Sequence, residues 1–198
     1  MLTPFSDRSK AWEIHAVSLR RLAGVSLGEQ LDPWTLAPKV GLRVMDLESV
    51  LANLSREERL HLLRTAQRSW SGGVYPRVLP DGSRVCLLNS HHSYRRRKIT
   101  LMEEVCHVYL KHAPSGVAVA ADGVQVREYV AKQEQQAYGV VAAALMPWHT
   151  LFPALNRGIG IDELAEAYDV TPDLVTYRIK ITGAYRLSLL SKLGVEDG

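Results

Sequence analysis

Hydrophobic positions along the chain predict a succession of short helices and strands. In residues 9–22 the apolar side chains recur near the helical period, which predicts a first helix. Asp32 before Pro33 has the chemistry of a helix N-cap and first turn, and Gly41 ends the short helix that they open. Residues 42–45 then follow as a strand.

The middle of the chain predicts two hairpins between two longer helices. Turn residues mark the hairpins, and a capping sequence marks the first helix. The predicted elements are a helix from Ser55 to about Arg68, a hairpin of strands 74–79 and 85–88 around residues 80–83, a hairpin of strands 117–120 and 124–126 around Asp122-Gly123, and a helix that ends at Leu145 before Pro147.

Residues 161–175 have the outline of a helix-turn-helix. The second helix would begin with Thr171 as its cap and Pro172 in its first turn, and it would expose Arg178 and Lys180. One interpretation is contact with DNA or with a repressor. The other is a small packing module, which the pattern favours because few other basic residues support reading of a DNA groove.

Composition and charge indicate a globular protein of the cytoplasm. Of the 198 residues, 46% are hydrophobic and 23% are charged, which suffices for a core and is an ordinary charge content. The net charge of +3 is too small to indicate nucleic-acid binding by itself. We expect no signal peptide and no membrane span. Two cysteines without C-x-x-C spacing favour reduced thiols over a disulfide.

The most informative stretch lies in residues 99–111, which predict a helix. Glu103 and His107 are four residues apart, so their side chains stand one above the other, about 6 Å apart along the helix axis. With Glu104 they read as an H-E-x-x-H zinc helix in which Glu replaces the first His, and Glu104 is the general base. The alternative is a solvated acidic helix face with one incidental His.

The flanking residues resemble those of ImmA/IrrE-type metallopeptidases over roughly residues 30–190. The similar runs are the basic residues 95–98 with Thr100-Leu101 before the motif, residues 132–139, the helix end Leu145-Met146-Pro147, and the hairpin residues 71–73, 81–82 and 87–89. In that family an early Glu of the second helix is the third metal ligand. The resemblance implies that Glu134 takes this role.

The resemblance also implies a fold and a function. The expected fold class is α+β, with a zincin-like core that holds a small antiparallel sheet and with a helical, helix-turn-helix-like C-terminal part. We expect residues 1–150 to form the metallopeptidase-like domain and residues 151–198 the helical module. The expected activity is hydrolysis of a peptide bond by metal-activated water. The implied substrate is a helix-turn-helix repressor, so the implied role is regulation of transcription, as in a stress response.

The first ligand departs from the family pattern. A Zn²⁺ site of Glu103, His107 and Glu134 would have a net charge of zero, whereas two His and one Glu leave +1. A less positive site ionises its water at higher pH, and the extra carboxylate also suits harder metals such as Mn²⁺. The activity is then weakened or redirected. A non-catalytic repressor-binding protein that keeps the fold, and a DNA-binding regulator, are the alternatives.

Two residues of this region, Tyr138 and Cys106, have two interpretations each. Tyr138 lies one turn after Glu134 and either polarises a substrate carbonyl or packs beside the site. Cys106 either binds metal or packs tightly, and packing is favoured because the family usually has a small residue there. His112 follows the helix end, where a cation is favourable.

Overall fold

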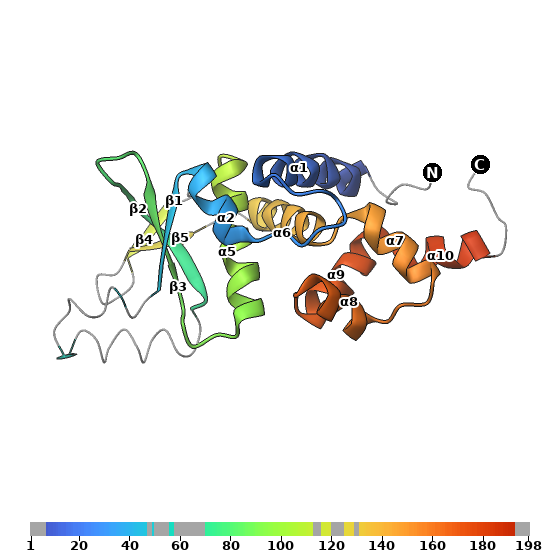
Figure 1. Ribbon diagram of the computed structural model, residues 1–198. Helices are drawn as coiled ribbons and strands as arrows, with labels where there is room; N and C mark the ends of the chain where they lie inside the picture. Colours follow the sequence, from blue (N-terminus) through green and yellow to red (C-terminus); the bar gives the residue numbers. More distant parts are fainter. Residues whose placement is uncertain are drawn as a thin grey trace. The chain divides into compact units, whose positions relative to one another are not determined.

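The computed structural model describes residues 7–46, 49, 56–57, 70–112, 116–119, 125–128 and 131–192 (Figure 1). These residues form a mostly helical α+β fold, which confirms the predicted fold class. The chain folds into two compact units. We call Asp32–Ala137 the sheet unit, and Met1–Leu31 together with Tyr138–Gly198 the helical unit. The division by function into residues 1–150 and 151–198 stays a prediction.

Three strands form the sheet of the sheet unit, in the order β1-β3-β2. They are β1 (Leu42–Asp46), β2 (Gly72–Val78) and β3 (Arg84–Leu88). Strands β2 and β3 make the predicted antiparallel hairpin, but β1 runs parallel to β3, so the sheet is mixed and not wholly antiparallel. A parallel pair needs a long connection, and the chain between β1 and β3 provides one.

The turn of this hairpin forms at the predicted residues. The backbone N–H of Leu79 donates to the carbonyl of Ser83 at 2.8 Å. The Asp81 carboxylate accepts from the Ser83 N–H at 3.0 Å. Gly82 has a φ of 82°, in the left-handed region that favours glycine. These bonds are local, which explains why the turn is predictable from a few residues.

The first short helices of the sheet unit are α2 (Pro33–Leu36) and the 3-10 helix η1 (Ala37–Val40). The Asp32 side chain accepts from the Trp34 N–H at 2.9 Å, so Asp32 is the N-cap that the sequence predicts. Gly41 ends η1 with a φ of 79°. Local capping chemistry therefore sets both ends of this segment.

Helix α5 (Tyr94–Tyr109) carries the E-E-x-x-H motif and packs against β2 and β3. It begins before the predicted start at Ile99, because the Ser93 hydroxyl caps it by accepting from the Arg96 N–H at 3.4 Å. Its fully buried apolar residues are Leu101, Met102, Val105 and Cys106. The burial of these side chains determines which face of α5 packs into the core of the sheet unit.

Two further strands, β4 (Gly116–Val119) and β5 (Gln125–Glu128), form the predicted antiparallel pair. The expected turn residues Asp122-Gly123 lie outside the described residues. Of the helix predicted from Ser55 to about Arg68, only residues 56 and 57 are described, and both are helical.

The helical unit contains only helices in the part that the structure describes. They are α1 (Asp7–Ala23), the later part of α6 (Ala131–Leu145), α7 (Trp148–Asn156), α8 (Ile161–Tyr168), α9 (Pro172–Thr182) and α10 (Ala184–Lys192). Helices α8 and α9 have the predicted helix-turn-helix outline. Asp169, with a φ of 50°, ends α8, and the Thr171 hydroxyl caps α9 by accepting from the Leu174 N–H at 3.3 Å.

The prediction that α9 exposes both Arg178 and Lys180 is wrong for Arg178. The Arg178 side chain is 0% exposed, donates from Nε to the carbonyl of Met146 at 2.9 Å, and pairs with Glu13 of α1. Lys180 is exposed. The acidic partner is distant in sequence, so the helical period alone could not reveal it. Helix α9 therefore offers less positive charge to a DNA backbone than the sequence suggested.

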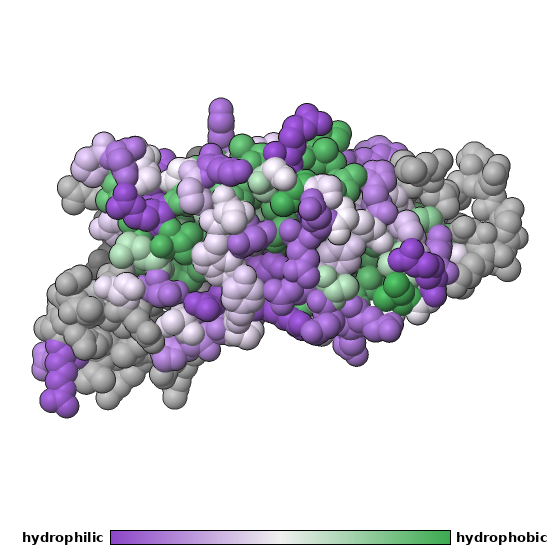
Figure 2. Space-filling model, viewed as in Figure 1, coloured by the Kyte–Doolittle hydropathy of each residue, from purple (hydrophilic) through white to green (hydrophobic). Residues whose placement is uncertain are grey.

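Among the described helices, none is by itself long and apolar enough to cross a membrane, and α6 with α7 passes that test only as a pair bent by 64°. The face shown in Figure 2 mixes hydrophilic and hydrophobic residues. Large exposed hydrophobic residues are Ile14, Leu22, Tyr75, Val78, Tyr94 and Tyr185. Exposed apolar residues of this kind are normal on protein surfaces.

Gly139 of α6 lies against the indole ring of Trp12, and both residues are buried. A Cβ at position 139 would stand 2.5 Å from two ring carbons. We expect Gly139→Ala to lower the free energy of unfolding by about 1–3 kcal/mol, because a packed core resists added volume. Urea denaturation measures the change. Gly28→Ala, where a Cβ meets nothing within 4 Å, is the control, and equal midpoints for the two variants would contradict the prediction.

Candidate metal centre

Helix α5 buries the polar residues of its motif. Glu104 is 8% exposed, His107 is 2% exposed, and Glu103 is partly buried. Removing carboxylates and an imidazole from water costs free energy unless charge or hydrogen bonds compensate. A solvated acidic helix face therefore does not describe α5. Buried acids grouped on one helix beside a buried imidazole are instead typical of a functional site.

Glu134, in the first turn of α6, meets His107. The Nε2 atom of His107 lies 3.5 Å from the Oε1 atom of Glu134. Two ligand atoms on a tetrahedral Zn²⁺, each bonded at about 2.0–2.2 Å, lie about 3.3–3.6 Å apart. The pair therefore fits two corners of a zinc coordination sphere. The Glu134 side chain is 50% exposed, so this position is open to solvent on one side.

Glu103 belongs to the same group of charges. Its pKa is raised to about 7, first by burial and then by the carboxylates of Glu104 and Glu134, while Arg96 opposes the shift. Within the described residues, however, no three or more His, Cys, Asp or Glu side chains form a complete metal cluster. The structure thus brings His107 and Glu134 together, and the role of Glu103 as a ligand stays a prediction.

This acidic group should destabilise the metal-free protein at alkaline pH. A carboxyl group whose pKa rises from 4.5 to about 7 on folding stabilises the fold only while it is protonated. That stability is complete below pH 4.5 and is lost as the pH rises through 7. We expect Glu103→Gln to raise the free energy of unfolding at pH 8 by about 3 kcal/mol relative to the unchanged chain.

Chemical denaturation with a chelator, between pH 4 and pH 8, measures this difference. The two proteins should converge near pH 4. Glu166→Gln, on the exposed part of α8, is the control and should change stability by less than about 0.5 kcal/mol. If Glu103→Gln does not raise the free energy of unfolding at pH 8, solvent or a counter-charge offsets the cost of burying the charged Glu103 carboxylate.

Cys106 packs in the core beneath the motif. It is 0% exposed, and burial, followed by the charge of Glu103, raises the pKa of its thiol well above the usual range. Its full burial agrees with tight packing, the interpretation favoured by the sequence.

Tyr138 packs against Tyr177. Their rings meet edge to face with centroids 4.7 Å apart, and both residues belong to the helical unit. This contact shows that Tyr138 packs within the helical unit, and packing beside the metal centre stays a prediction. A role for Tyr138 with a substrate carbonyl stays a prediction.

Sequence reasoning missed the connection between the motif and the residues His112 and Gln136. The Nδ1 atom of His112 lies 3.0 Å from Nδ1 of His107, and its Nε2 atom lies 3.2 Å from Oε1 of Gln136. The sequence assigned His112 only to the helix end. The sequence does show a second His five residues after the motif His, but that spacing alone does not indicate that the two rings meet.

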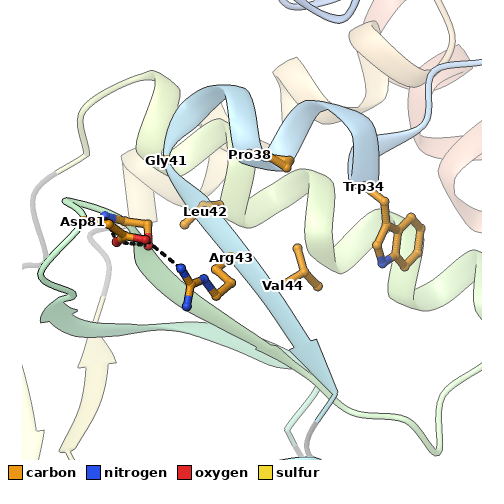
Figure 3. Close-up of a pocket in the computed structure, with 8 residues that line it drawn as sticks. Trp34, Pro38, Gly41, Leu42, Arg43, Val44 and Asp81 are labelled. Carbon is orange, nitrogen blue, oxygen red and sulfur yellow. Dashed lines mark hydrogen bonds and ion pairs between the residues drawn. The ribbon is translucent and has the colours of Figure 1, made fainter.

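A shallow groove also lies on the sheet unit. One wall is apolar, with Trp34 and Pro38, and the other carries the Arg43–Asp81 ion pair at 2.6 Å (Figure 3). None of the residues of the predicted metal centre lines it. Its two charged residues pair with each other.

Comparison with protein families identifies the chain. The model of the IrrE N-terminal-like domain, Peptidase_M78, matches residues 56–180, more than half of the chain. No curated protein matches the chain. The matched segment contains the hairpin, the whole of α5 and α6, and the helix-turn-helix outline. The chain therefore belongs to the Peptidase_M78 family of ImmA/IrrE-type metallopeptidases.

Proposed function

We propose that this protein is a cytoplasmic metal-dependent endopeptidase that cuts a helix-turn-helix repressor and so relieves repression of transcription, as in a stress response. The observation that carries the proposal is the 3.5 Å approach of His107 Nε2 to Glu134 Oε1, made by the helix that also buries Glu104. Membership of a metallopeptidase family supports a hydrolytic reaction.

The proposed ligands are His107, Glu134 and Glu103. The nitrogen and oxygen donors suit Zn²⁺, and a donor set with two carboxylates also suits Mn²⁺. A divalent ion held there would lower the pKa of a coordinated water. The carboxylates of Glu103, Glu104 and Glu134 supply negative charge that such an ion would neutralise. Burial first, and then the charges of Glu104 and Glu134, raise the pKa of Glu103 in the metal-free centre.

Glu104 is the proposed general base. It follows Glu103 on α5 and is itself buried, so its carboxylate has little exposure to bulk water. A carboxylate in this position takes the proton from the attacking water and passes it to the leaving amine. The half-exposed Glu134 marks the open side by which a peptide would reach the centre.

The departure at position 103 favours one alternative, a repressor-binding protein without protease activity. A Glu in place of the first His makes the centre less positive, and a less positive centre activates water less. Such a protein would keep the fold and would dock a repressor without cutting it.

Metal content and cleavage, measured in parallel, test the proposal. Elemental analysis gives the zinc and manganese content of the purified protein, and a library of internally quenched peptides gives the cleavage. We compare the unchanged chain with His107→Ala and Glu103→His. The change at 103 adds one positive charge to the centre, so zinc binding should tighten and cleavage near neutral pH should increase.

The outcomes separate the two functions. Stoichiometric metal with cleavage that His107→Ala removes supports the endopeptidase. Metal recruitment by Glu103→His without any cleavage supports the binding protein. If the unchanged chain and Glu103→His cleave equally well at every pH, the argument that Glu103 weakens the centre is wrong.

A further inference from the structure

Helix α5 ends in a way that folds the chain back over the motif His. Leu110 is the C-cap of α5, and the next residue, Lys111, has a φ of 56°, in the left-handed region. The Lys111 N–H donates to Val108 O at 3.1 Å, and the His112 N–H donates to His107 O at 3.0 Å. These two bonds are the pattern of a Schellman motif, in which the second residue past the cap returns to the third residue from the helix end.

This ending brings two imidazole rings together. The rings of His107 and His112 meet edge to face with centroids 5.0 Å apart, and their Nδ1 atoms lie 3.0 Å apart. At that distance one nitrogen carries the proton and the other accepts it, because two lone pairs or two protons would repel each other. The protonation of one ring therefore dictates that of the other.

Gln136 decides which ring donates. Its Oε1 atom, 3.2 Å from Nε2 of His112, can only accept a hydrogen bond. A neutral His112 then carries its proton on Nε2 and presents a lone pair on Nδ1. His107 then donates from Nδ1, and the lone pair on its Nε2 faces Oε1 of Glu134 at 3.5 Å. A lone pair and a carboxylate oxygen that face each other repel, so this arrangement favours a cation between them.

We infer that His112 and Gln136 are positioning residues that hold His107 in the tautomer with its proton on Nδ1, so that the Nε2 lone pair and the Glu134 carboxylate can bind one divalent ion together. The inference rests on the proposed function in one respect only, namely that the bound ion serves in hydrolysis. Imidazole ligands in metal sites usually donate their second N–H to a carboxylate or a carbonyl. Here a second imidazole accepts it and is in turn oriented by a glutamine of α6.

The tautomer can be read without metal and without activity. Long-range proton–nitrogen correlation spectra of the chelator-treated, nitrogen-15-labelled protein should show His107 protonated on Nδ1 and His112 on Nε2. Gln136→Leu removes the acceptor and should mix the tautomers of both rings. Gln136→Glu restores an acceptor at the same place and should restore the spectrum. Gln135→Leu, on the exposed neighbouring position of α6, should leave it unchanged.

Zinc affinity, measured by competition with a chromophoric chelator, is the second measurement. His112→Phe keeps a ring but loses the acceptor, so zinc should bind about 10–100-fold more weakly. A His107 ring protonated on Nε2 in the unchanged chain would overturn the inference, and so would unchanged affinity in both His112→Phe and Gln136→Leu. Normal tautomers and zinc affinity without peptide cleavage would leave the inference standing and defeat only the proposed endopeptidase.

Discussion

Glu104→Gln should abolish peptide cleavage while the protein keeps its metal. Glutamine has the shape of glutamate but cannot take a proton from water, and general base catalysis contributes about 10²–10⁴-fold to a rate. We therefore expect kcat/KM to fall by at least about 10²-fold. The metal content should not fall, because Glu104 is not one of the proposed ligands. Peptide cleavage assays and elemental analysis of the same preparation measure both quantities.

His107→Ala is the matched comparison on the same helix. It removes one of the two side chains that the structure brings together, so both the metal and the cleavage should be lost. Cleavage that survives Glu104→Gln would mean that another group is the base and that the motif is read in the wrong register. Loss of metal in Glu104→Gln would place Glu104 among the ligands.

Glu13→Ala should be among the most destabilising single changes in the helical unit. Arg178 is 0% exposed and pairs with Glu13, and burial lowers its pKa while the charge of Glu13 opposes that shift. The other oxygen of Glu13 accepts from the Trp148 N–H at 3.2 Å. Removing one partner of a buried ion pair leaves an uncompensated charge, at a cost of about 3–5 kcal/mol.

Denaturation of three variants tests this account. Glu13→Ala combined with Arg178→Met replaces the pair by apolar groups and should recover most of the lost stability. Asp7→Ala breaks the exposed pair of Asp7 with Lys10 on the same helix, and we expect a loss of less than about 1 kcal/mol. If Glu13→Ala costs no more than Asp7→Ala, Arg178 finds its compensation elsewhere.

Elements that depend on local chemistry could be predicted from the sequence. The cap at Asp32, the turn at Asp81 and Gly82, and the cap at Thr171 each involve hydrogen bonds between residues at most four apart. Such bonds are encoded in a few neighbouring residues. The pairing of β2 with β3 follows from the same turn, so the hairpin was predictable too.

Contacts between distant residues were not predictable in the same way. The parallel pairing of β1 with β3 depends on a crossover, and the burial of Arg178 depends on Glu13 of the first helix. A hydrophobic pattern reports which face of an element is apolar, but it does not name the partner of a buried charge. The sequence therefore placed Arg178 on the surface.

The candidate site shows both cases. The four-residue spacing put Glu103 and His107 on one face of α5, and resemblance to a family added Glu134, which the structure places beside His107. The contact with His112 depends on a left-handed Lys111, a conformation that few lysines adopt and that no residue pattern signals. Helix ends without glycine thus hide part of a site from sequence reasoning.

The reaction rate of the two buried cysteines can report how often the sheet unit opens. Cys86 and Cys106 are both 0% exposed, and burial raises the pKa of both thiols, so alkylating reagents should react slowly with the folded chain. Both belong to the sheet unit, one on β3 and one on the helix of the motif. The rate at which a thiol reagent labels them therefore measures how often the sheet unit opens. Adding zinc should slow the labelling, and removing zinc should speed it up. The labelling rate therefore reports how much a bound ion stabilises the sheet unit.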